Sequence, residues 1–179
     1  MKKVFSVLAV AALILVSFSS CDPQEKSMAE MLTISKGWVL QSATSSPDYV
    51  MSTGEEVADL FNGYLYDWEK EYILVFNANG NEVVKPGKTV VPEGEPGFSE
   101  ETSLGNWAIR EGVLEGGTSY DYLDMYIPFV INQQNQVPLC HCQIISFDEN
   151  MLRLKFRFND DENPAKGTYE WTLTYVPAK

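Results

Sequence analysis

Two segments near the end of the chain alternate strictly between hydrophobic and polar residues. In residues 151–158 the even-numbered positions from Leu152 to Phe158 are hydrophobic, and the odd-numbered positions between them are basic. Residues 168–176 repeat the pattern with Tyr, Trp and Leu on one face and Thr and Glu on the other. A period of two predicts β-strands with one buried and one wet face, which antiparallel sheets allow.

Further strands are predicted along most of the chain. The first lies in residues 36–44 and starts at Trp38. Asn79-Gly80 separates two apolar runs, which is the strongest short-range signal for a β-hairpin. Three more strands are predicted in residues 104–112, 120–128 and 138–147. Residues 129–137 are predicted to form either a short strand or an extended loop.

One segment breaks the strand rhythm. Hydrophobic residues recur there at the spacing of a helix face, which predicts a short amphipathic helix. These residues are Val57, Leu60, Phe61 and Tyr64. Residues 85–103 are rich in Pro, Gly and Glu and are expected to form a long surface loop. About eight strands, one helical insert and mostly short connections predict an all-β fold, an antiparallel up-and-down barrel or a sandwich.

The first twenty residues have the plan of a secretory signal. Lys2 and Lys3 precede an apolar run from Val4 to Phe18, and small residues follow before Cys21. The run is shorter than the roughly 18–20 residues that cross a bilayer. The stretch resembles a bacterial lipoprotein signal, which implies cleavage before a lipidated Cys21. We therefore expect three parts: a signal in 1–20, a lipidated tether in 21–35 and one domain in 36–179.

The charge balance excludes some partners. The chain has 13 basic and 25 acidic residues, and removal of the signal would make the net charge more negative, from −12 to −14. Nucleic-acid phosphates need clustered Lys and Arg, so this balance argues against nucleic acid. It argues equally against electrostatic binding to anionic lipid headgroups. The membrane partner is expected to be reached through the lipid on Cys21 alone.

A family resemblance follows from the order of several short motifs. They are "KGWVL" at the first strand, "ILVFNANGNEV" as a hairpin, "LGNWAI" in mid-chain and "IISFDENMLRLKF" before a closing aromatic strand. Together they resemble the lipocalin-like lipoproteins of Bacteroidota over residues 36–176. The resemblance implies a calycin-type barrel and a lipid-anchored location in the cell envelope, at the outer membrane. The function of this family is mostly uncharacterised, and we expect the domain to bind a small apolar ligand or to act as a binding module.

Six aromatic residues are the candidates for lining a ligand site inside the barrel. They are Trp38, Tyr72, Phe76, Trp107, Phe156 and Trp171. Ligand pockets are mostly apolar with a few polar groups, but large aromatics also fill barrel cores. An enclosed cavity of about 300 Å3 or more would favour a ligand, and a filled interior would favour a scaffold.

The stretch "LCHCQII" holds the only histidine, His141, between Cys140 and Cys142. Alternate residues of a strand face opposite ways, so the two cysteines are expected to share one face and His141 to lie on the other. One metal ion could not be reached by all three, and zinc usually takes four ligands. A disulfide between the cysteines would be strained. We expect two strand cysteines, no metal and no cofactor.

Catalytic signatures are scarce. The chain contains no Gly-x-Ser-x-Gly elbow, no His-Glu-x-x-His and no phosphate-binding glycine loop. The acidic cluster Asp160, Asp161 and Glu162 lacks the ligand spacing of a calcium loop and is read as a hairpin tip. We expect a binding protein rather than an enzyme, with an unrecognised hydrolase as a third possibility. The alternative to a small ligand is a protein-interaction component of an envelope complex, which uses the outer barrel faces or residues 85–103.

Overall fold

The alternating segments near the end of the chain pair with each other. In a computed structural model, β9 (Leu152–Asn159) and β10 (Thr168–Pro177) are antiparallel, with Leu154 opposite Leu173 and Phe156 opposite Trp171. The alternating hydrophobic side chains from Leu152 to Phe156 and from Tyr169 to Tyr175 are buried, and the basic side chains of β9 lie on the other face. The structure describes residues 26–34, 36–113, 119–131, 136–159 and 168–179; within β9, the side chain of Phe158 lies outside the description.

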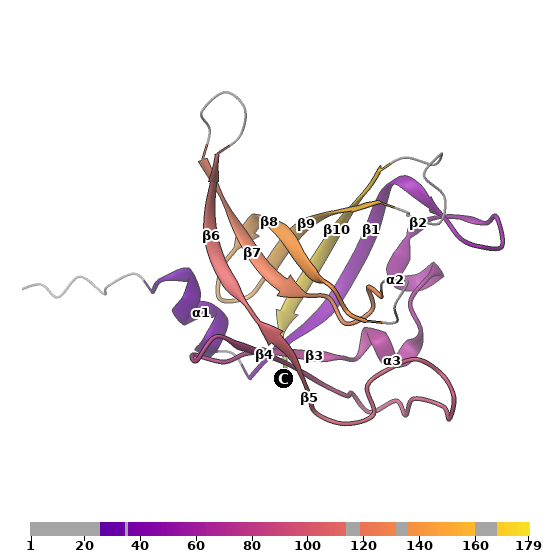
Figure 1. Cartoon of the computed structure of the whole chain (residues 1–179), viewed down its shortest axis with the longest axis horizontal. Coiled ribbons are helices and arrows are strands. Elements are labelled where there is room, and N and C mark those ends of the chain that lie inside the picture. The colour runs from indigo at the N-terminus through magenta and orange to yellow at the C-terminus, as the bar shows by residue number, and fades with distance from the viewer. Residues whose placement is uncertain (1–25, 35, 114–118, 132–135, 160–167) are drawn as a thin grey trace, which may run out of the picture.

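Antiparallel pairing extends through the described chain to give a nearly closed barrel (Figure 1). The strands run in the order β5-β4-β3-β1-β10-β9-β8-β7-β6, and β2 pairs with β1 outside this path. The remaining strands are β1 (Trp38–Val50), β2 (Glu56–Asp59), β3 (Ile73–Phe76), β4 (Asn81–Lys85), β5 (Thr102–Asn106), β6 (Ala108–Val113), β7 (Ser119–Tyr126) and β8 (Leu139–Phe147). The predicted all-β, antiparallel up-and-down barrel is thus confirmed.

The two edges of the sheet follow each other in the chain. Only Trp107 separates β5, which pairs with β4, from β6, which pairs with β7. β5 and β6 are therefore two halves of one bent segment that carries both edges of the sheet. Counted as one strand, this segment gives an eight-strand meander. Its bend is held by Trp107, whose backbone nitrogen donates to the Gly80 carbonyl and whose indole donates to the Asn77 carbonyl.

The seam between the two edges is closed by a buried side chain. Glu82 on β4 points into the barrel, and its Oε2 accepts a hydrogen bond of 2.8 Å from the Tyr126 backbone nitrogen on β7. Gly105 lies opposite Glu82 on β5, and a side chain there would overlap the ring of Tyr126. Tyr126 lies beyond the last pair between β6 and β7, Ala108 with Asp124, and the Glu82 carboxyl oxygen supplies the acceptor for its backbone amide.

The expected helix is shorter than its hydrophobic stripe. Val57 lies in β2, and only α2 (Leu60–Gly63) follows it, with Asp59 accepting from the Asn62 backbone nitrogen as a cap. A second short helix, α3 (Asp67–Lys70), precedes β3. The prediction of one helix through the stripe was therefore wrong, although Val57 and Leu60 are buried as the stripe required. A short hydrophobic spacing cannot separate a strand end followed by one helical turn from a longer helix.

The described part of the segment expected as a tether is structured. Residues Met28–Ile34 form α1, and Leu32 on it is buried. The Leu32 carbonyl accepts a hydrogen bond from the indole of Trp38 at 3.1 Å, which ties α1 to the start of β1. The folded unit thus begins before residue 36. No helix among the described residues is long and apolar enough to cross a bilayer.

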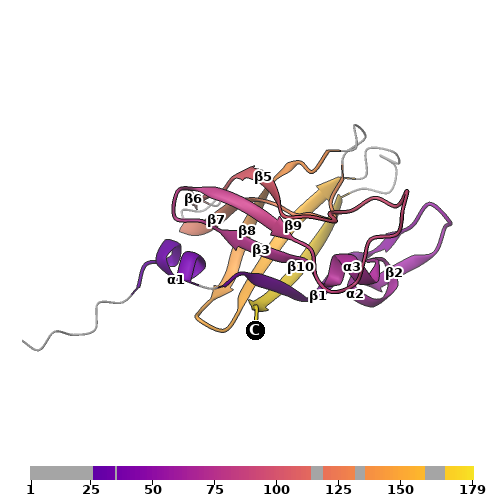
Figure 2. The ribbon, with the colours of Figure 1, turned by 90° about the horizontal axis from the view of Figure 1, so that it is seen from below.

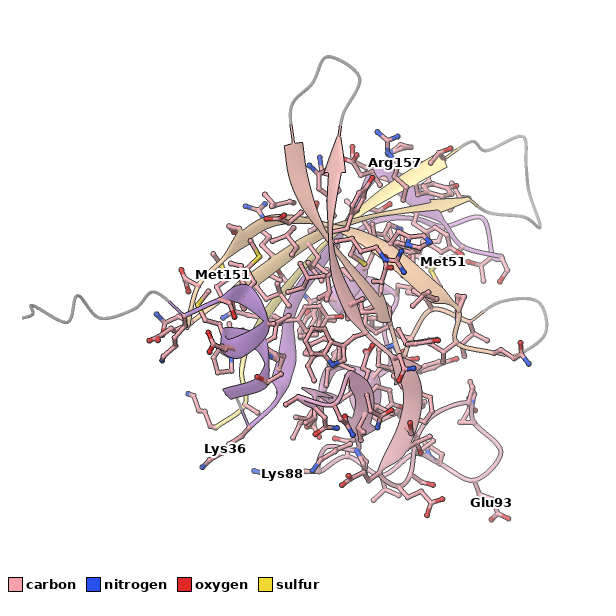
Figure 3. The ribbon with its side chains drawn as sticks, turned by 60° about the vertical axis from the view of Figure 1, so that its left-hand side comes forward. Lys36, Met51, Lys88, Glu93, Met151 and Arg157 are labelled. Carbon is pink, nitrogen blue, oxygen red and sulfur yellow. The ribbon has the colours of Figure 1, made fainter. Side chains whose placement is uncertain are left out.

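The helices lie on two sides of the barrel. Figure 2 shows α1 on one side and α2, α3 and β2 on the opposite side. Figure 3 shows Lys36 and Lys88 at the bottom of the view and Arg157 near the top. β1 begins two residues after Lys36 and ends directly before Met51.

The first strand and the hairpin match expectation at their starts. β1 begins at Trp38 as predicted but continues to Val50, beyond the expected residues 36–44. β3 and β4 form the hairpin, and its turn has Gly80 at a φ of 86°, with the Gly80 nitrogen donating to the Asn77 carbonyl. The described residues of 129–137 form no strand.

The loop expected in 85–103 connects β4 and β5 and is held at two points. Glu71 Oε2 accepts from the backbone nitrogens of Lys88 and Thr89 at 2.7 Å, and the Tyr72 hydroxyl accepts from the Phe98 nitrogen at 2.8 Å. These contacts fasten the loop beside α3.

Candidate functional site

The six candidate aromatics are parts of a packed core. Five of them are buried, and Trp107 is half-buried. They lie in separate groups: Trp38 packs on Phe147 near α1, whereas Phe156 and Trp171 pack on each other with ring centroids 6.3 Å apart. Phe76 and Trp107 form a third group at 5.6 Å. All six belong to one packed hydrophobic core, within which these ring contacts are pairwise, and their ligand-binding role stays a prediction.

The aromatic cluster at one end of the barrel extends beyond the predicted residues. Tyr49 meets Tyr64, Tyr169 and Trp171 edge-on, with centroids 5.1 to 5.7 Å apart. Edge-to-face contacts of this kind add about 0.5–1.5 kcal/mol each beyond area burial. This end of the barrel is therefore filled by ring packing, which favours the scaffold reading of the aromatics.

The strand β8 has the sidedness expected from its alternation. Cys140 and Cys142 are buried and carry free thiols, while the His141 side chain is 69% exposed on the other face. Burial raises the pKa of Cys140 to about 12 and raises that of Cys142 well above its usual range. The prediction that the two cysteines share one face opposite His141, on the core face or partly exposed, is confirmed, with both on the core face. Their raised pKa values disfavour the thiolate form that a cysteine nucleophile needs.

His141 belongs to a cluster that sequence reasoning missed. Asp124 on β7 lies directly opposite His141 on β8, and its Oδ1 is 2.6 Å from His141 Nδ1. Its Oδ2 is 2.5 Å from the Nε atom of Arg110 on β6. The Asp124 side chain is only 3% exposed although it lies on the outer face of the barrel, because the other two side chains cover it.

The two contacts of Asp124 differ in kind. The contact with Arg110 is an ion pair without the alignment of a hydrogen bond, and Asp124 Oδ2 has no hydrogen-bond partner among the described residues. The contact with His141 determines the tautomer of the imidazole. A carboxylate only accepts hydrogen bonds, so the ring carries its proton on Nδ1. The Nε2 atom of His141 is thereby left on the side away from Asp124.

These side chains line an open hollow of about 340 Å3 on the outer wall, formed by Arg110, Tyr122, Asp124 and His141. We call it the outer-wall groove. None of the six candidate aromatics lines it. The groove joins an aromatic side chain, a guanidinium and an imidazole with a buried acid behind them. A few convergent polar groups in a concavity are the usual mark of a binding site.

A second hollow lies at the end of β1. It measures about 460 Å3 and is lined by Pro47, Asp48, Val50, Glu56 and Tyr169. Its two carboxylates, on Asp48 and Glu56, are exposed and no cationic side chain lines it. Without a side chain held in place by a buried partner, this hollow is the weaker candidate.

The sequence contains one indication of the outer-wall groove, the acid Asp124, but does not show its partners. Asp124 stands between Leu123 and Met125, which are both fully buried. An acid in such a strand suggests a polar contact on its outward face. Its partners, however, come from the register of β7 with β6 and β8, which the sequence does not encode locally.

Neither a metal site nor a related protein identifies the function of the groove. Among the described residues, no group of three or more His, Cys, Asp or Glu side chains could hold a metal ion. The acids at 160–162 lie outside the described residues. The fold and site define a small antiparallel β-barrel with a polar groove on its outer wall. No protein-family model, curated protein or solved structure matches the chain.

Proposed function

We propose that this protein is a lipid-anchored envelope protein that acts as a binding module, and that its ligand docks in the outer-wall groove. The lipoprotein-like signal and Cys21 support the anchor, and the resemblance to lipocalin-like lipoproteins supports the envelope location. A nearly closed barrel supports a rigid scaffold, because closure removes most free sheet edges.

The observation that carries the proposal is the buried Asp124, which holds two exposed side chains in place. Arg110 and His141 are 68% and 69% exposed, yet both contact one carboxylate that is almost fully buried. Side chains held in this way lose less entropy when they bind a ligand, which is what a pre-organised site requires. The residues that line the groove include no serine, threonine or cysteine nucleophile, so binding accounts for the site better than hydrolysis does.

A protein partner is the second candidate, and one observation favours it. Leu139 and Ile145 on β8 are each 42% exposed, on either side of His141. Exposed hydrophobic residues beside a polar groove favour contact with the surface of a protein partner over exposure to solvent. A small apolar ligand inside the barrel, which is expected from the sequence, would have to separate the packed aromatic groups.

Thermal unfolding of the full chain tests the proposal against compounds sorted by chemistry, with Arg110→Ala as the matched variant. A ligand at a hundred times its dissociation constant stabilises a protein by about 2.7 kcal/mol, which raises the melting temperature measurably. We expect at least one polar compound to stabilise the native chain and not the variant. Apolar compounds that stabilise both equally would place the ligand in the interior and contradict the groove.

A further inference from the structure

We propose that the outer-wall groove binds an oxyanion, a carboxylate or phosphate group, with Arg110 and His141 as its contacts and Asp124 as a positioning residue. This inference rests on the proposed function and names the chemistry of the ligand. It is carried by the geometry of the three side chains and by the place of the three arginines on one wall of the barrel.

The three arginines of this acidic protein share one wall of the barrel. The chain has a net charge of −12, and its arginines are Arg110, Arg153 and Arg157. All three lie on the outer face of the β6–β9 part of the barrel, which also carries His141. Arg157 and the neighbouring Lys155 pair with Glu170, whereas Arg110 pairs with the buried Asp124. Cationic side chains gathered on one face attract anions locally even when the whole molecule is negative.

The guanidinium of Arg110 has its binding end open. Asp124 forms its ion pair with the Nε atom of Arg110. The two terminal nitrogens then remain as a parallel pair of donors on a side chain that is 68% exposed. This pair matches the two oxygens of a carboxylate or phosphate, and such bidentate contacts are stronger than single ones. Arg110 is thereby held at Nε, and no ion pair or hydrogen bond among the described residues occupies its two terminal nitrogens.

The acid behind the groove does not face a ligand. The Asp124 side chain is 3% exposed, whereas the imidazole of His141 is 69% exposed. A ligand entering the groove therefore meets Arg110, His141 and the wall formed by Tyr122, while the charge of Asp124 is offset by Arg110. His141 contributes its Nε2 position, which donates to an oxyanion when the ring carries a second proton.

A single resonance reports on this site. His141 is the only histidine, so the imidazole of an untagged chain gives one Cε1–H signal in proton NMR. The full chain in detergent is titrated with inorganic phosphate and, separately, with acetate, at ionic strength balanced with sodium chloride. We expect the His141 signal to shift and saturate with at least one anion. Tighter binding of phosphate identifies a phosphate-bearing ligand, and tighter binding of acetate identifies a carboxylate.

Matched variants locate the binding. Arg110→Ala is expected to weaken the affinity at least tenfold, and Arg110→Lys, which keeps the charge but lacks the paired donors, about fivefold or more. Arg153→Ala removes an exposed arginine of the same wall outside the groove and is expected to change the affinity less than twofold. Equal losses in Arg110→Ala and Arg153→Ala would reduce the effect to diffuse charge and overturn the proposal. A shift that tracks sodium chloride alone would do the same.

The positioning role of Asp124 has its own readout. Asp124→Asn keeps the shape but removes the charge that assigns the proton to His141 Nδ1. We expect the nitrogen-15 shifts of the ring to show a smaller share of that tautomer, together with weaker anion binding. Unchanged ring tautomers with unchanged binding would remove Asp124 from the site. Since Arg110→Lys alters an exposed side chain, it tests the anion contact even if Asp124→Asn fails to fold.

Failure of this inference can be told apart from failure of the binding-module proposal. If neither anion binds but thermal unfolding reveals another compound that depends on Arg110, the groove is a binding site and the oxyanion chemistry is wrong. If no compound depends on Arg110 in either experiment, both proposals are wrong.

Discussion

At the scale of single residues, Glu82 is the most unusual side chain of the barrel. Its Oε2 accepts from the Tyr126 nitrogen, but its Oε1 is buried without a hydrogen-bond partner among the described residues. Burial raises the pKa of Glu82 to about 8, and the titratable groups around it are Cys140, Cys142 and Tyr175. At neutral pH the seam is therefore closed by a neutral carboxyl group.

This shift makes stability depend on pH. The folded pKa of Glu82 lies above its unfolded value near 4.5, so the folded state binds the proton more tightly. Its contribution to stability is complete below pH 4.5, falls as pH rises to about 8, and is constant above. At about 1.4 kcal/mol per pKa unit the loss between pH 5 and 8 is roughly 3 to 5 kcal/mol.

We expect Glu82→Gln to remove most of that dependence, because the amide cannot ionise and a side-chain oxygen still accepts from Tyr126. Urea unfolding at pH 5, 6.5 and 8 measures it, with the exposed Glu100→Gln as control. Glu69, whose pKa burial raises to about 7, accounts for a residual slope in the variant. Parallel curves for the native chain and Glu82→Gln would show that Glu82 ionises freely in the fold.

The two strand cysteines lead to a second prediction at this scale. Cys140 and Cys142 are 2% and 0% exposed, and burial raises the pKa of both thiols. We expect iodoacetamide at pH 8 to alkylate them at least a hundredfold more slowly in the folded chain than in urea, because the reaction needs an accessible thiolate. Peptide mass spectrometry follows each site. Comparable rates in both states would mean that β8 opens readily.

At the scale of elements, the seam between β5 and β7 depends on one glycine. Gly105 has a φ of 152°, and the Tyr126 ring occupies the space that a side chain would need. We expect Gly105→Ala to destabilise the fold by about 1–3 kcal/mol, the usual cost of forcing an extra group into a packed site. Urea unfolding gives the difference in free energy.

Gly54 provides the control for backbone conformation alone. Its φ is 88°, and a methyl group there would contact nothing within 4 Å. Gly54→Ala should therefore report only the strain of a positive φ. In the double variant Gly105→Ala/Tyr126→Ala, the cost of the alanine at 105 should shrink, because the ring it meets is gone. Strict additivity of the two substitutions would argue that the ring is not the obstacle.

At the scale of the whole molecule, the proposed lipid anchor on Cys21 would attach the barrel to a membrane. We expect Cys21→Ser to leave the membrane fraction and to lose incorporation of labelled palmitate, since Cys21 is the proposed attachment site and several acyl chains are needed for stable anchoring. Cell fractionation and metabolic labelling measure this, with Cys142→Ala as the cysteine control. A Cys21→Ser chain that keeps both label and membrane association would contradict the lipoprotein assignment.

The distribution of elements shows where sequence patterns are reliable. Strands β9 and β10 were predicted closely because one face of each is buried, so a shift by one residue would expose every hydrophobic side chain. The segment from Val57 to Tyr64 was predicted as one helix and is a strand followed by a single helical turn. Four hydrophobic positions are too few to distinguish these when tertiary packing decides the backbone.

The sequence by itself determined the all-β class, the start of the first strand at Trp38 and the opposite facing of His141 and its neighbouring cysteines. Each of these follows from local spacing, because the side-chain period of a strand is set by its own backbone. Only the tertiary structure decided that Arg110, Asp124 and His141 meet, and that Glu82 closes the seam. Those contacts depend on the register between strands that are distant in the chain. They also depend on which side chains shield an acid from water. No local sequence pattern determines either of these.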